Sequence, residues 1–502
     1  MQIDVMAQQR PNILWYCTDQ QRFDTIAALG NPYIHTPNID AFVQQGTAFT
    51  HAYCQSPICT PSRASFLTGM YPSRVHNPSN GNGWVHPEVT ANLVTRLLAD
   101  AGYDGGLVGK LHLAGAAGAR EPRVNDGYRY FKYSHSPRHD WPLAQHDYAA
   151  WVAAQGVDPE TVLLRASDPR NHPPERDYES WIAAMGSFME PSPTNDNTPP
   201  ELPQTTWATE ASIEFITQDR PADQPWFLSV NVYDPHPPYN PPWEYYRRYD
   251  SETLPGPHFQ DSDLAHQARL TSSGIDFQSE ALRPETFDGK RLQAAYYAMI
   301  EQVDEQFGRL LQALEDSGQA EHTVVIFTSD HGESAGDYGL LQKGCRFFDG
   351  LSRVPLIWRL PGRVQADLCS NALVELTDIA PTLLELADLP VPSAMQGLSL
   401  RSILEGQVSP DRHREFVRCE YLDAINKPDH TFATMYRDSQ WKLNVYHGHD
   451  IGELYDMEAD PFEHESLWDS PAHQGIKLDL MKRSFDATVL AADPGPPRVS
   501  SY

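Results

Sequence analysis

Short apolar runs alternate with amphipathic stretches along most of the chain. The apolar runs have strand length and end in polar residues, and they lie at 11–18, 105–108, 227–232 and 323–328. Such runs are typical of strands buried on both faces. Helical spacing of apolar residues predicts helices over 38–45, 61–68, 91–101, 205–217 and 291–316. Strands that alternate with helices predict an α/β fold with a large, mostly parallel sheet sandwiched by helices.

The pattern changes near residue 406. Short strand-like runs at 414–420, 433–437 and 441–445 precede a helix predicted over 476–489. A chain of 502 residues is too long for one ordinary core. We therefore predict a large domain at 1–405, which would carry the chemistry, and a smaller C-terminal α+β subdomain at 406–502 that contains an antiparallel sheet.

Two long segments, 121–202 and 246–285, follow neither the helical nor the strand period and are rich in Pro, Asp, His and Ser. Long irregular segments inside a compact domain are usually functional or disordered. We expect these two to frame a substrate pocket.

Composition narrows the class of partner. The chain has 38 Lys and Arg against 67 Asp and Glu, which gives a net charge of −29. Nucleic acids and anionic membranes would repel such a protein at long range, so neither is an expected partner. An anionic substrate would need a local cluster of cations. The first ten residues lack the basic flank and apolar run of a secretory signal, and no run is long enough to span a bilayer, so we expect a cytoplasmic protein.

Six cysteines, at 17, 54, 59, 345, 369 and 419, are scattered without metal-type spacing, so reduced thiols are expected. Cys59 is distinctive because it opens the run Cys59-Thr60-Pro61-Ser62-Arg63 directly before the helix predicted over 61–68. A helix N-terminus offers backbone donors and a positive dipole end to an anion. Taken alone, Cys59 is equally explained as a buried thiol packed like a small hydrophobe.

Oxygen donors lie at the ends of two predicted strands. Asp19 and Gln20 follow the first strand, and Asp330 and His331 follow the strand at 323–328. Ligands of open α/β sheets collect at the carboxyl ends of strands. Two carboxylates, an amide and one imidazole suit Ca²⁺ or Mn²⁺ better than a structural zinc. Each acidic residue alone could equally cap a helix or turn.

Together these segments resemble the signature of the type I sulfatases, the formylglycine-dependent family of the alkaline phosphatase superfamily. The resemblance implies an alkaline-phosphatase-like fold. It also implies that a formylglycine-generating enzyme oxidises Cys59 to formylglycine, whose hydrate is the nucleophile. The metal ligands implied are Asp19, Gln20, residue 59, Asp330 and His331.

Three further segments carry the resemblance towards the C-terminus. Gly109-Lys110-Leu111-His112-Leu113 resembles the family segment that places a Lys and a His against the nucleophile and the sulfate. Asp234-Pro235-His236 resembles the segment that bears a His near the leaving group, and Lys343 lies in a block that resembles the one with a second sulfate-binding Lys. Without the resemblance, each Lys would be a solvated surface charge and each His an ordinary packed residue.

The resemblance implies hydrolysis of a sulfate monoester, such as an aryl or saccharide sulfate, with one bound divalent ion. Arg63, Lys110 and Lys343 would stabilise charge on the sulfuryl oxygens. His236, with Lys343, would serve the leaving alcohol, and His112 would take a proton to release sulfate. Substrate contacts are also predicted at Asn77, Asn80 and Asn82, although such residues often only make turns.

Two other functions stay open. The pairs Asp19-Gln20 and Asp330-His331 resemble choline sulfatases and many bacterial sulfatases but also phosphonate monoester hydrolases, which use the same nucleophile on phosphodiesters and phosphonates. Against these hydrolases, Lys110 and His112 match the sulfatase version of their segment. A pseudoenzyme that binds an anion without turnover would keep the fold, but none of the residues whose loss would mark it is missing. By analogy with relatives of this architecture, a homo-oligomer is compatible with the sequence.

Overall fold

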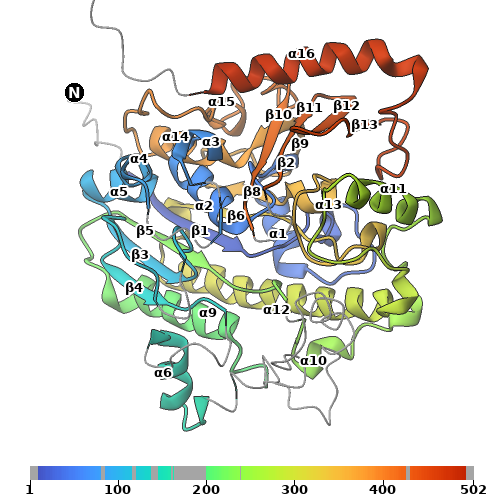
Figure 1. Cartoon of the computed structure of the whole chain (residues 1–502). Helices are drawn as coiled ribbons and strands as arrows, with labels where there is room; N and C mark the ends of the chain where they lie inside the picture. Colours follow the sequence, from blue (N-terminus) through green and yellow to red (C-terminus); the bar gives the residue numbers. More distant parts are fainter. Residues whose placement is uncertain are drawn as a thin grey trace, which may run out of the picture.

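The computed structural model describes residues 10–77, 79–80, 85–115, 120–136, 145–159, 162, 199–237, 239–425 and 430–492. Within these residues the chain forms a sheet of nine strands and a second sheet of four. In Figure 1 the larger sheet crosses the middle of the molecule, and the smaller one lies beneath the C-terminal helix at the top.

The larger sheet is mixed but mostly parallel around its centre. Its strands are β1 (Asn12–Thr18), β2 (Thr47–Tyr53), β3 (Asp104–Gly109), β4 (Tyr130–Tyr133), β5 (Trp226–Asn231), β6 (Thr323–Ser329), β7 (Arg353–Val354), β8 (Leu356–Arg359) and β9 (Leu368–Glu375). They lie in the order β4-β3-β5-β1-β6-β8-β2-β7, with β9 also paired to β2. The strands from β4 to β6 are parallel, whereas β8 is antiparallel to both β6 and β2. This confirms the predicted α/β fold.

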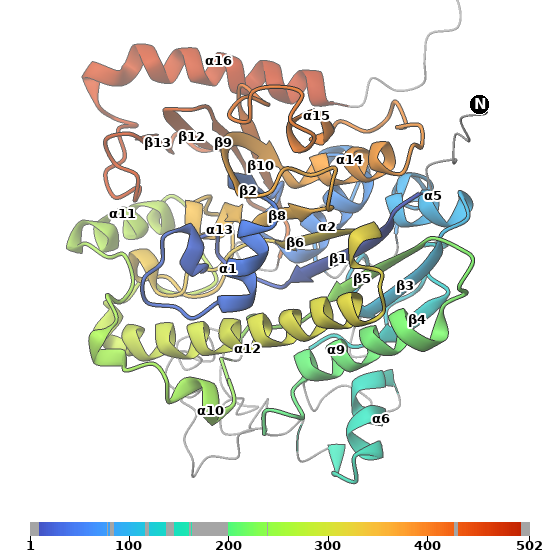
Figure 2. The same cartoon turned by 180° about the vertical axis from the view of Figure 1, so that it is seen from behind.

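Helices cover both faces of this sheet. The described helices before the smaller sheet are α1 (Pro37–Gln44), α2 (Cys59–Thr68), α3 (Pro72–Val75), α4 (Pro87–Asn92), α5 (Val94–Asp100), α6 (Asp147–Ala154), α9 (Gln204–Glu214), α10 (Trp243–Tyr246), α11 (Asp261–Ser272), α12 (Gly289–Asp316), α13 (Asp349–Ser352), α14 (Ile379–Leu386) and α15 (Arg401–Leu404). Figures 1 and 2 show α9 and α12 along one face and α2, α5 and α14 along the other.

Strand β1 explains why the apolar runs have no polar alternation. Successive side chains of a strand point to opposite faces. Trp15 packs against Phe66 of α2, with ring centroids 5.1 Å apart, and Tyr16 packs against Phe307 of α12, at 5.0 Å. Both faces of β1 are therefore buried, and both need apolar residues.

The smaller sheet is antiparallel throughout. It consists of β10 (Val417–Leu422), β11 (Phe432–Arg437), β12 (Trp441–Tyr446) and β13 (Gly452–Asp456), and α16 (Gln474–Ala491) packs across it. This confirms the predicted antiparallel sheet with its closing helix. The two sheets meet where Glu420 N donates to Gln55 O at 2.8 Å. The domain boundary at 405/406 falls between α15 and β10 and stays a prediction.

The predicted irregular segments contain regular elements, which corrects the sequence analysis. Segment 121–202 includes β4 and α6, and segment 246–285 includes α11. The hydrophobic pattern does not mark α11, because a capping box between Gln260 and Asp263 fixes its start while much of its surface is polar. Strand β4 has four residues and lies at the edge of the sheet, too short for a periodic signal.

In the described part of the chain, every helix is too short or too polar to cross a lipid bilayer. All six cysteine thiols are unpaired, as expected.

Candidate active site

Cys59 is the first residue of α2, a helix whose residues are all buried. The preceding Ile58 offers no side-chain cap. Asn80 replaces that cap, because its Oδ1 accepts a hydrogen bond from Thr60 N at 2.9 Å. Unpaired N–H groups in the first turn of a helix carry a partial positive charge. The thiol of Cys59 therefore lies where negative charge is stabilised.

Two neighbouring strands bring further donors to Cys59. Strands β1 and β6 are parallel, with Thr18 opposite Ser329, so the residues that follow them leave the sheet at the same edge. Asp19 Oδ1 lies 3.9 Å from Cys59 Sγ, and His331 Nε2 lies 3.2 Å from it. The structure thus brings together residues from three distant parts of the sequence.

The ligand atoms of four side chains at this edge lie within 4.8 Å of one another, and the four are Asp19, Cys59, Asp330 and His331. His331 Nδ1 lies 2.8 Å from Gly332 O, so Nδ1 carries a proton, and Nε2 offers its lone pair to the group when the imidazole is neutral. The ammonium of Lys343 also rests against these donors, 2.9 Å from Cys59 Sγ and 3.2 Å from His331 Nε2. Donors that already attract a cation, with two carboxylates and one imidazole, fit Ca²⁺ or Mn²⁺.

Gln20 joins this group through its amide oxygen. Its Nε2 donates to Glu333 Oε2, and its Oε1 accepts from Lys343 Nζ at 2.8 Å. Tyr296 OH donates to the main-chain oxygen of Gln20 at 2.6 Å. The amide is therefore oriented with its oxygen towards the cationic centre. Glu333 and Tyr296 were not predicted from the sequence, although the position of Glu333 directly after Asp330-His331-Gly332 was a usable signal.

Arg63 uses three of its five N–H donors within the site. Its Nε donates to Asp330 Oδ2 at 2.9 Å, and its Nη2 to Asp19 Oδ2 at 3.2 Å. Its Nη1 donates to Lys110 O at 3.2 Å. Burial opposes its charge, but Asp330 and Asp19 raise the pKa of Arg63 and keep it cationic. Arg63 thus holds the two carboxylates in place, and its contact with the sulfuryl oxygens stays a prediction.

The surrounding cations stabilise negative charge on Asp19 and Cys59. Burial alone would raise the pKa of Asp19, but Lys110, with Nζ 2.5 Å from Asp19 Oδ2, and neighbouring cationic groups hold that pKa well below its usual value. Burial and Asp19 oppose ionisation of Cys59, yet Lys110, Lys343 and His331 hold the pKa of its thiol well below the usual value. The site is therefore built for an anion at residue 59.

Lys110 and His112 follow β3 at the same edge of the sheet. A Cβ at Gly109 would lie 2.0 Å from Asn231 O, so the close approach of β5 requires glycine before Lys110. Asn231 Nδ2 donates to Lys110 O at 2.7 Å and fixes the chain there. Burial, with Lys110 and Arg63 nearby, holds the pKa of His112 well below its usual value. His112 is a neutral imidazole that can accept a proton.

His236 follows β5, and a further histidine lies near it. The Nδ1 atom of His236 lies 2.6 Å from Pro237 O, so Nδ1 carries the proton and Nε2 carries a lone pair. Burial and then Lys343 lower the pKa of His236 to about 3. The further histidine is His135, which was not predicted from the sequence. Its ring packs edge-on against the ring of His112, with the ring centroids 4.6 Å apart. No periodic pattern marks His135, because it lies in a segment without one.

The predicted substrate asparagines are placed in different ways. Asn77 is 1% exposed, and its amide donates to Leu113 O at 3.0 Å, so it supports the loop of His112. Asn80 caps α2 beside Cys59. Asn82 lies outside the described residues. Contacts of these three residues with a substrate stay predictions.

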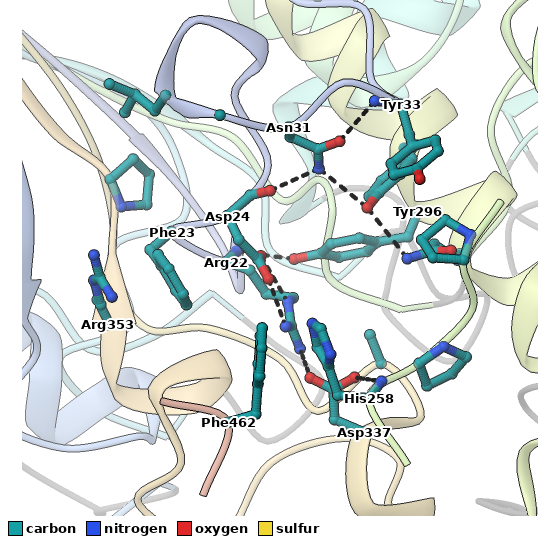
Figure 3. A pocket seen from close by; sticks show the side chains of 18 of the residues that line it. Arg22, Phe23, Asp24, Asn31, Tyr33, His258, Tyr296, Asp337, Arg353 and Phe462 are labelled. Carbon is teal, nitrogen blue, oxygen red and sulfur yellow. Dashed lines mark hydrogen bonds and ion pairs between the residues drawn. The ribbon is translucent and has the colours of Figure 1, made fainter. Parts of the chain in front are cut away.

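A cavity of about 410 Å³ opens beside the residues that follow Gln20 (Figure 3). Its buried cation, Arg22, is neutralised by Asp24 and Asp337, each 2.7 Å away. Arg353 packs over the ring of Phe23 at 4.0 Å. Among the described residues, none of the predicted site residues lines this cavity. The buried charge in this cavity is therefore balanced by carboxylates of the protein itself.

Comparisons with known proteins agree with this geometry. The family model described as "Sulfatase" matches residues 11–389, and a second one, "N-sulphoglucosamine sulphohydrolase, C-terminal", matches 336–488. An arylsulfatase of Clostridium perfringens is 28% identical over 94% of this chain and 93% of its own length. An uncharacterized sulfatase, YidJ, of Escherichia coli is 30% identical over 97% of this chain and 88% of its own length.

Among solved structures, a phosphonate monoester hydrolase of Agrobacterium radiobacter superposes with a TM-score of 0.77 at 25% identity, covering 96% of both chains. Its similarity extends over both sheets, so the whole architecture is shared. Given the family match across most of the chain and the sulfatase relatives along nearly its full length, the chain belongs to the sulfatase family of the alkaline phosphatase superfamily, the hydrolases of sulfuric esters.

Proposed function

We propose that this enzyme hydrolyses a sulfate monoester, in the manner of an arylsulfatase, with residue 59 as the nucleophile after its conversion to formylglycine. The observation that carries the proposal is the position of Cys59, at the N-terminus of α2 and 2.9 Å from Lys343 Nζ, among the converging donors. The conversion needs a formylglycine-generating enzyme as a maturation partner. The hydrate of the aldehyde would present two hydroxyl groups at this position.

A divalent ion, Ca²⁺ or Mn²⁺, would be held by Asp19, Gln20, Asp330 and His331 together with residue 59. When bound, such an ion acts as a Lewis acid that lowers the pKa of a coordinated hydroxyl. The residues of the chain prepare this place in advance. Arg63 aligns the two carboxylates, and Gly332 O fixes the His331 tautomer.

Lys110 and Lys343 would bind the sulfuryl oxygens. Both are buried ammonium groups beside Cys59, with Lys110 1% and Lys343 5% exposed. Cations in a water-excluded site stabilise developing charge strongly. One hydroxyl of the hydrate would lose its proton to water and attack sulfur, the S–O bond to the alcohol would break, and the sulfate would be left as an ester on residue 59.

The leaving alcohol needs a proton or a cation. The neutral His236 offers a lone pair at Nε2 rather than a proton. A bound sulfate ester adds negative charge beside it, which favours the protonated imidazole. We assign stabilisation of the leaving oxygen to Lys343 and its protonation to His236 after substrate binding.

His112 would complete the cycle. Its low pKa keeps it neutral and ready to take the proton of the remaining hydroxyl of residue 59. The electron pair of that O–H bond then forms the C=O bond, the C–O bond to sulfate breaks, and the aldehyde is regenerated. Water hydrates it for the next turnover. A serine or an unmodified cysteine has no second hydroxyl and cannot release sulfate in this way.

A second candidate is phosphonate monoester or phosphodiester hydrolysis by the same nucleophile, favoured by the superposition with the phosphonate monoester hydrolase. The test compares kcat/KM for an aryl sulfate and an aryl phosphonate monoester, with Cys59→Ala as the control for background hydrolysis. Preference for the sulfate supports the first proposal, and preference for the phosphonate supports the second. No turnover of either ester by protein that carries formylglycine would favour a non-catalytic anion-binding protein.

A further inference from the structure

The buried carboxylate of Glu121 contacts the backbone of the loop that carries His112. Glu121 is 2% exposed. Its Oε2 accepts a hydrogen bond from His112 N at 2.6 Å, and its Oε1 accepts one from Leu113 N at 2.9 Å. His112 has φ +54°, a left-handed conformation that is uncommon for a residue other than glycine. Successive N–H groups around a left-handed residue form a concave anion site, and Glu121 occupies this one.

Glu121 is not an ordinary ion-pair partner. Within the described chain no cation lies within ion-pair distance of Glu121. The charge of Arg63 lowers the pKa of Glu121 from a greater distance, without a direct contact. The remaining polar neighbours of Glu121 are the hydroxyl of Tyr133, at 3.4 Å, and the backbone N–H of Ala114. Burial raises the pKa of Glu121 to about 7, although the backbone hydrogen bonds from His112 and Leu113 lower it. A charge buried without a counterion is costly, so its position beside the loop of a reactive residue needs a reason.

We infer that Glu121 is a positioning residue for His112, and that its carboxylate holds the left-handed turn that carries the imidazole. Asn77 supports the same loop from the other side through Leu113 O. This inference rests on the proposed function, because it takes His112 as the group that accepts a proton during sulfate release. Glu121 itself touches no substrate and transfers no proton to it.

The pH dependence follows from the sign of the pKa shift. As the pH falls through about 7, Glu121 gains a proton, one oxygen becomes a hydroxyl, and the loop loses its anion. His112 does not produce a limb at that pH, because its own pKa is held well below the usual value. Loss of the Glu121 carboxylate is therefore expected to contribute an acid limb to kcat of the wild type near pH 7.

The experiment compares Glu121→Gln, Glu121→Ala and Asp126→Asn in enzyme that carries formylglycine. Asp126 is a matched control, because it is also buried and accepts from a backbone N–H, that of Tyr128 at 3.0 Å, but pairs with Arg123 and lies away from His112. Glu121→Gln is expected to lower kcat about 10- to 100-fold, as supporting residues of reactive groups do, with little change in KM and without the limb near pH 7. Asp126→Asn should keep the wild-type kcat and limb.

Added formate tests the anion site directly. Formate should raise kcat of Glu121→Ala several-fold by replacing the lost carboxylate, whereas the neutral formamide should not. Formate should also raise the melting temperature of Glu121→Ala but not that of Asp126→Asn, a readout that does not need turnover. Wild-type kcat in Glu121→Gln, or a loss of kcat in Glu121→Ala with neither response to formate, would overturn the inference. Absence of sulfate release from the wild type would instead overturn the proposed function, and the melting response would still test the anion site.

Discussion

Two buried ion clusters in this protein differ in what surrounds their lysines. In the first, Lys442 of β12 lies 2.8 Å from Asp349 Oδ1 and 2.7 Å from Glu463 Oε1, and Tyr53 OH donates to Asp349 at 3.1 Å. These residues come from both sheets, so the cluster ties the sheets together. Its positive charge is met by carboxylates of the protein itself.

In the second cluster, Lys343 lies against Gln20 Oε1, Cys59 Sγ and His331 Nε2. No carboxylate of the described chain lies within ion-pair distance of it. Lys343 is as deeply buried as many core residues, at 5% exposure. A buried cation without a carboxylate partner is costly unless another anion supplies the charge, such as the Cys59 thiolate before conversion or a bound ligand after it. The comparison indicates that burial of charge alone does not mark a functional site, and that the lack of an internal partner does.

The largest expected effect comes from the nucleophile. Cys59→Ala should lower sulfate release at least about 10⁴-fold, because no other group can form the covalent intermediate. The melting temperature of this variant should change little, since the ion cluster of Lys442, Asp349 and Glu463 is untouched. We call this cluster closed, because its carboxylates balance its lysine. Hydrolysis of an aryl sulfate by purified variant and wild type measures the effect. Retention of more than a few per cent of the wild-type rate would contradict the role of residue 59.

Breaking the closed cluster should affect stability rather than chemistry. Lys442→Met leaves Glu463 buried without its cation and Asp349 with Arg353 as its remaining ion-pair partner, and it should lower the free energy of unfolding by about 3–5 kcal/mol. Urea unfolding monitored by fluorescence measures this loss. The rate per folded molecule should equal that of the wild type. An equal loss of kcat in the folded fraction would remove the distinction between the two clusters.

We call the cluster around Lys343 open, because no carboxylate of the described chain pairs with its lysine. The matched substitution there should affect turnover rather than stability. Lys343→Met should lower kcat about 10²- to 10³-fold, the usual effect of removing one donor to transition-state charge. It should destabilise the fold less than Lys442→Met, because no carboxylate loses its partner. The two variants are measured side by side for turnover and unfolding. Greater destabilisation by Lys343→Met with a normal kcat would reverse our assignment.

Metal removal should sharpen the comparison further. An ion that binds only the folded protein stabilises it by about 2.7 kcal/mol when its concentration is a hundred times its Kd. EDTA should therefore lower both the turnover and the melting temperature of the wild type, and Ca²⁺ or Mn²⁺ should restore them. The Lys442→Met variant should show the same metal-dependent shift. Full turnover after exhaustive chelation would exclude the metal from the mechanism.

Much of the fold follows from the hydrophobic pattern. Strands β1, β3, β5 and β6 and helix α12 carry long apolar signals, because tertiary contacts bury them on several sides. Helix α11 and strand β4 depend on a capping box and on pairing at the sheet edge, neither of which produces a periodic signal. The antiparallel pairing of β8 is a long-range property that no local pattern reveals.

The site was predictable in its motifs but not in its supports. Asp19 and Asp330 could be placed together because parallel strands end at one edge of a sheet. The hydrogen bonds from Arg63 to Asp330 and Asp19 depend on side-chain geometry, which the spacing of residues along the sequence does not reveal. The same holds for Glu121 and His135, which lie in a segment without a periodic pattern, and for Tyr296, whose hydroxyl happens to face Gln20 from α12.

The most direct test of the central claim is the mass of the peptide that contains residue 59, combined with sulfate release by the same preparation. The protein should be expressed with a formylglycine-generating enzyme. We predict a peptide about 18 Da lighter than its cysteine form, as expected for conversion of a thiol to an aldehyde, and a rate of sulfate release proportional to the converted fraction. A plain thiol at residue 59 in fully active protein would contradict the account.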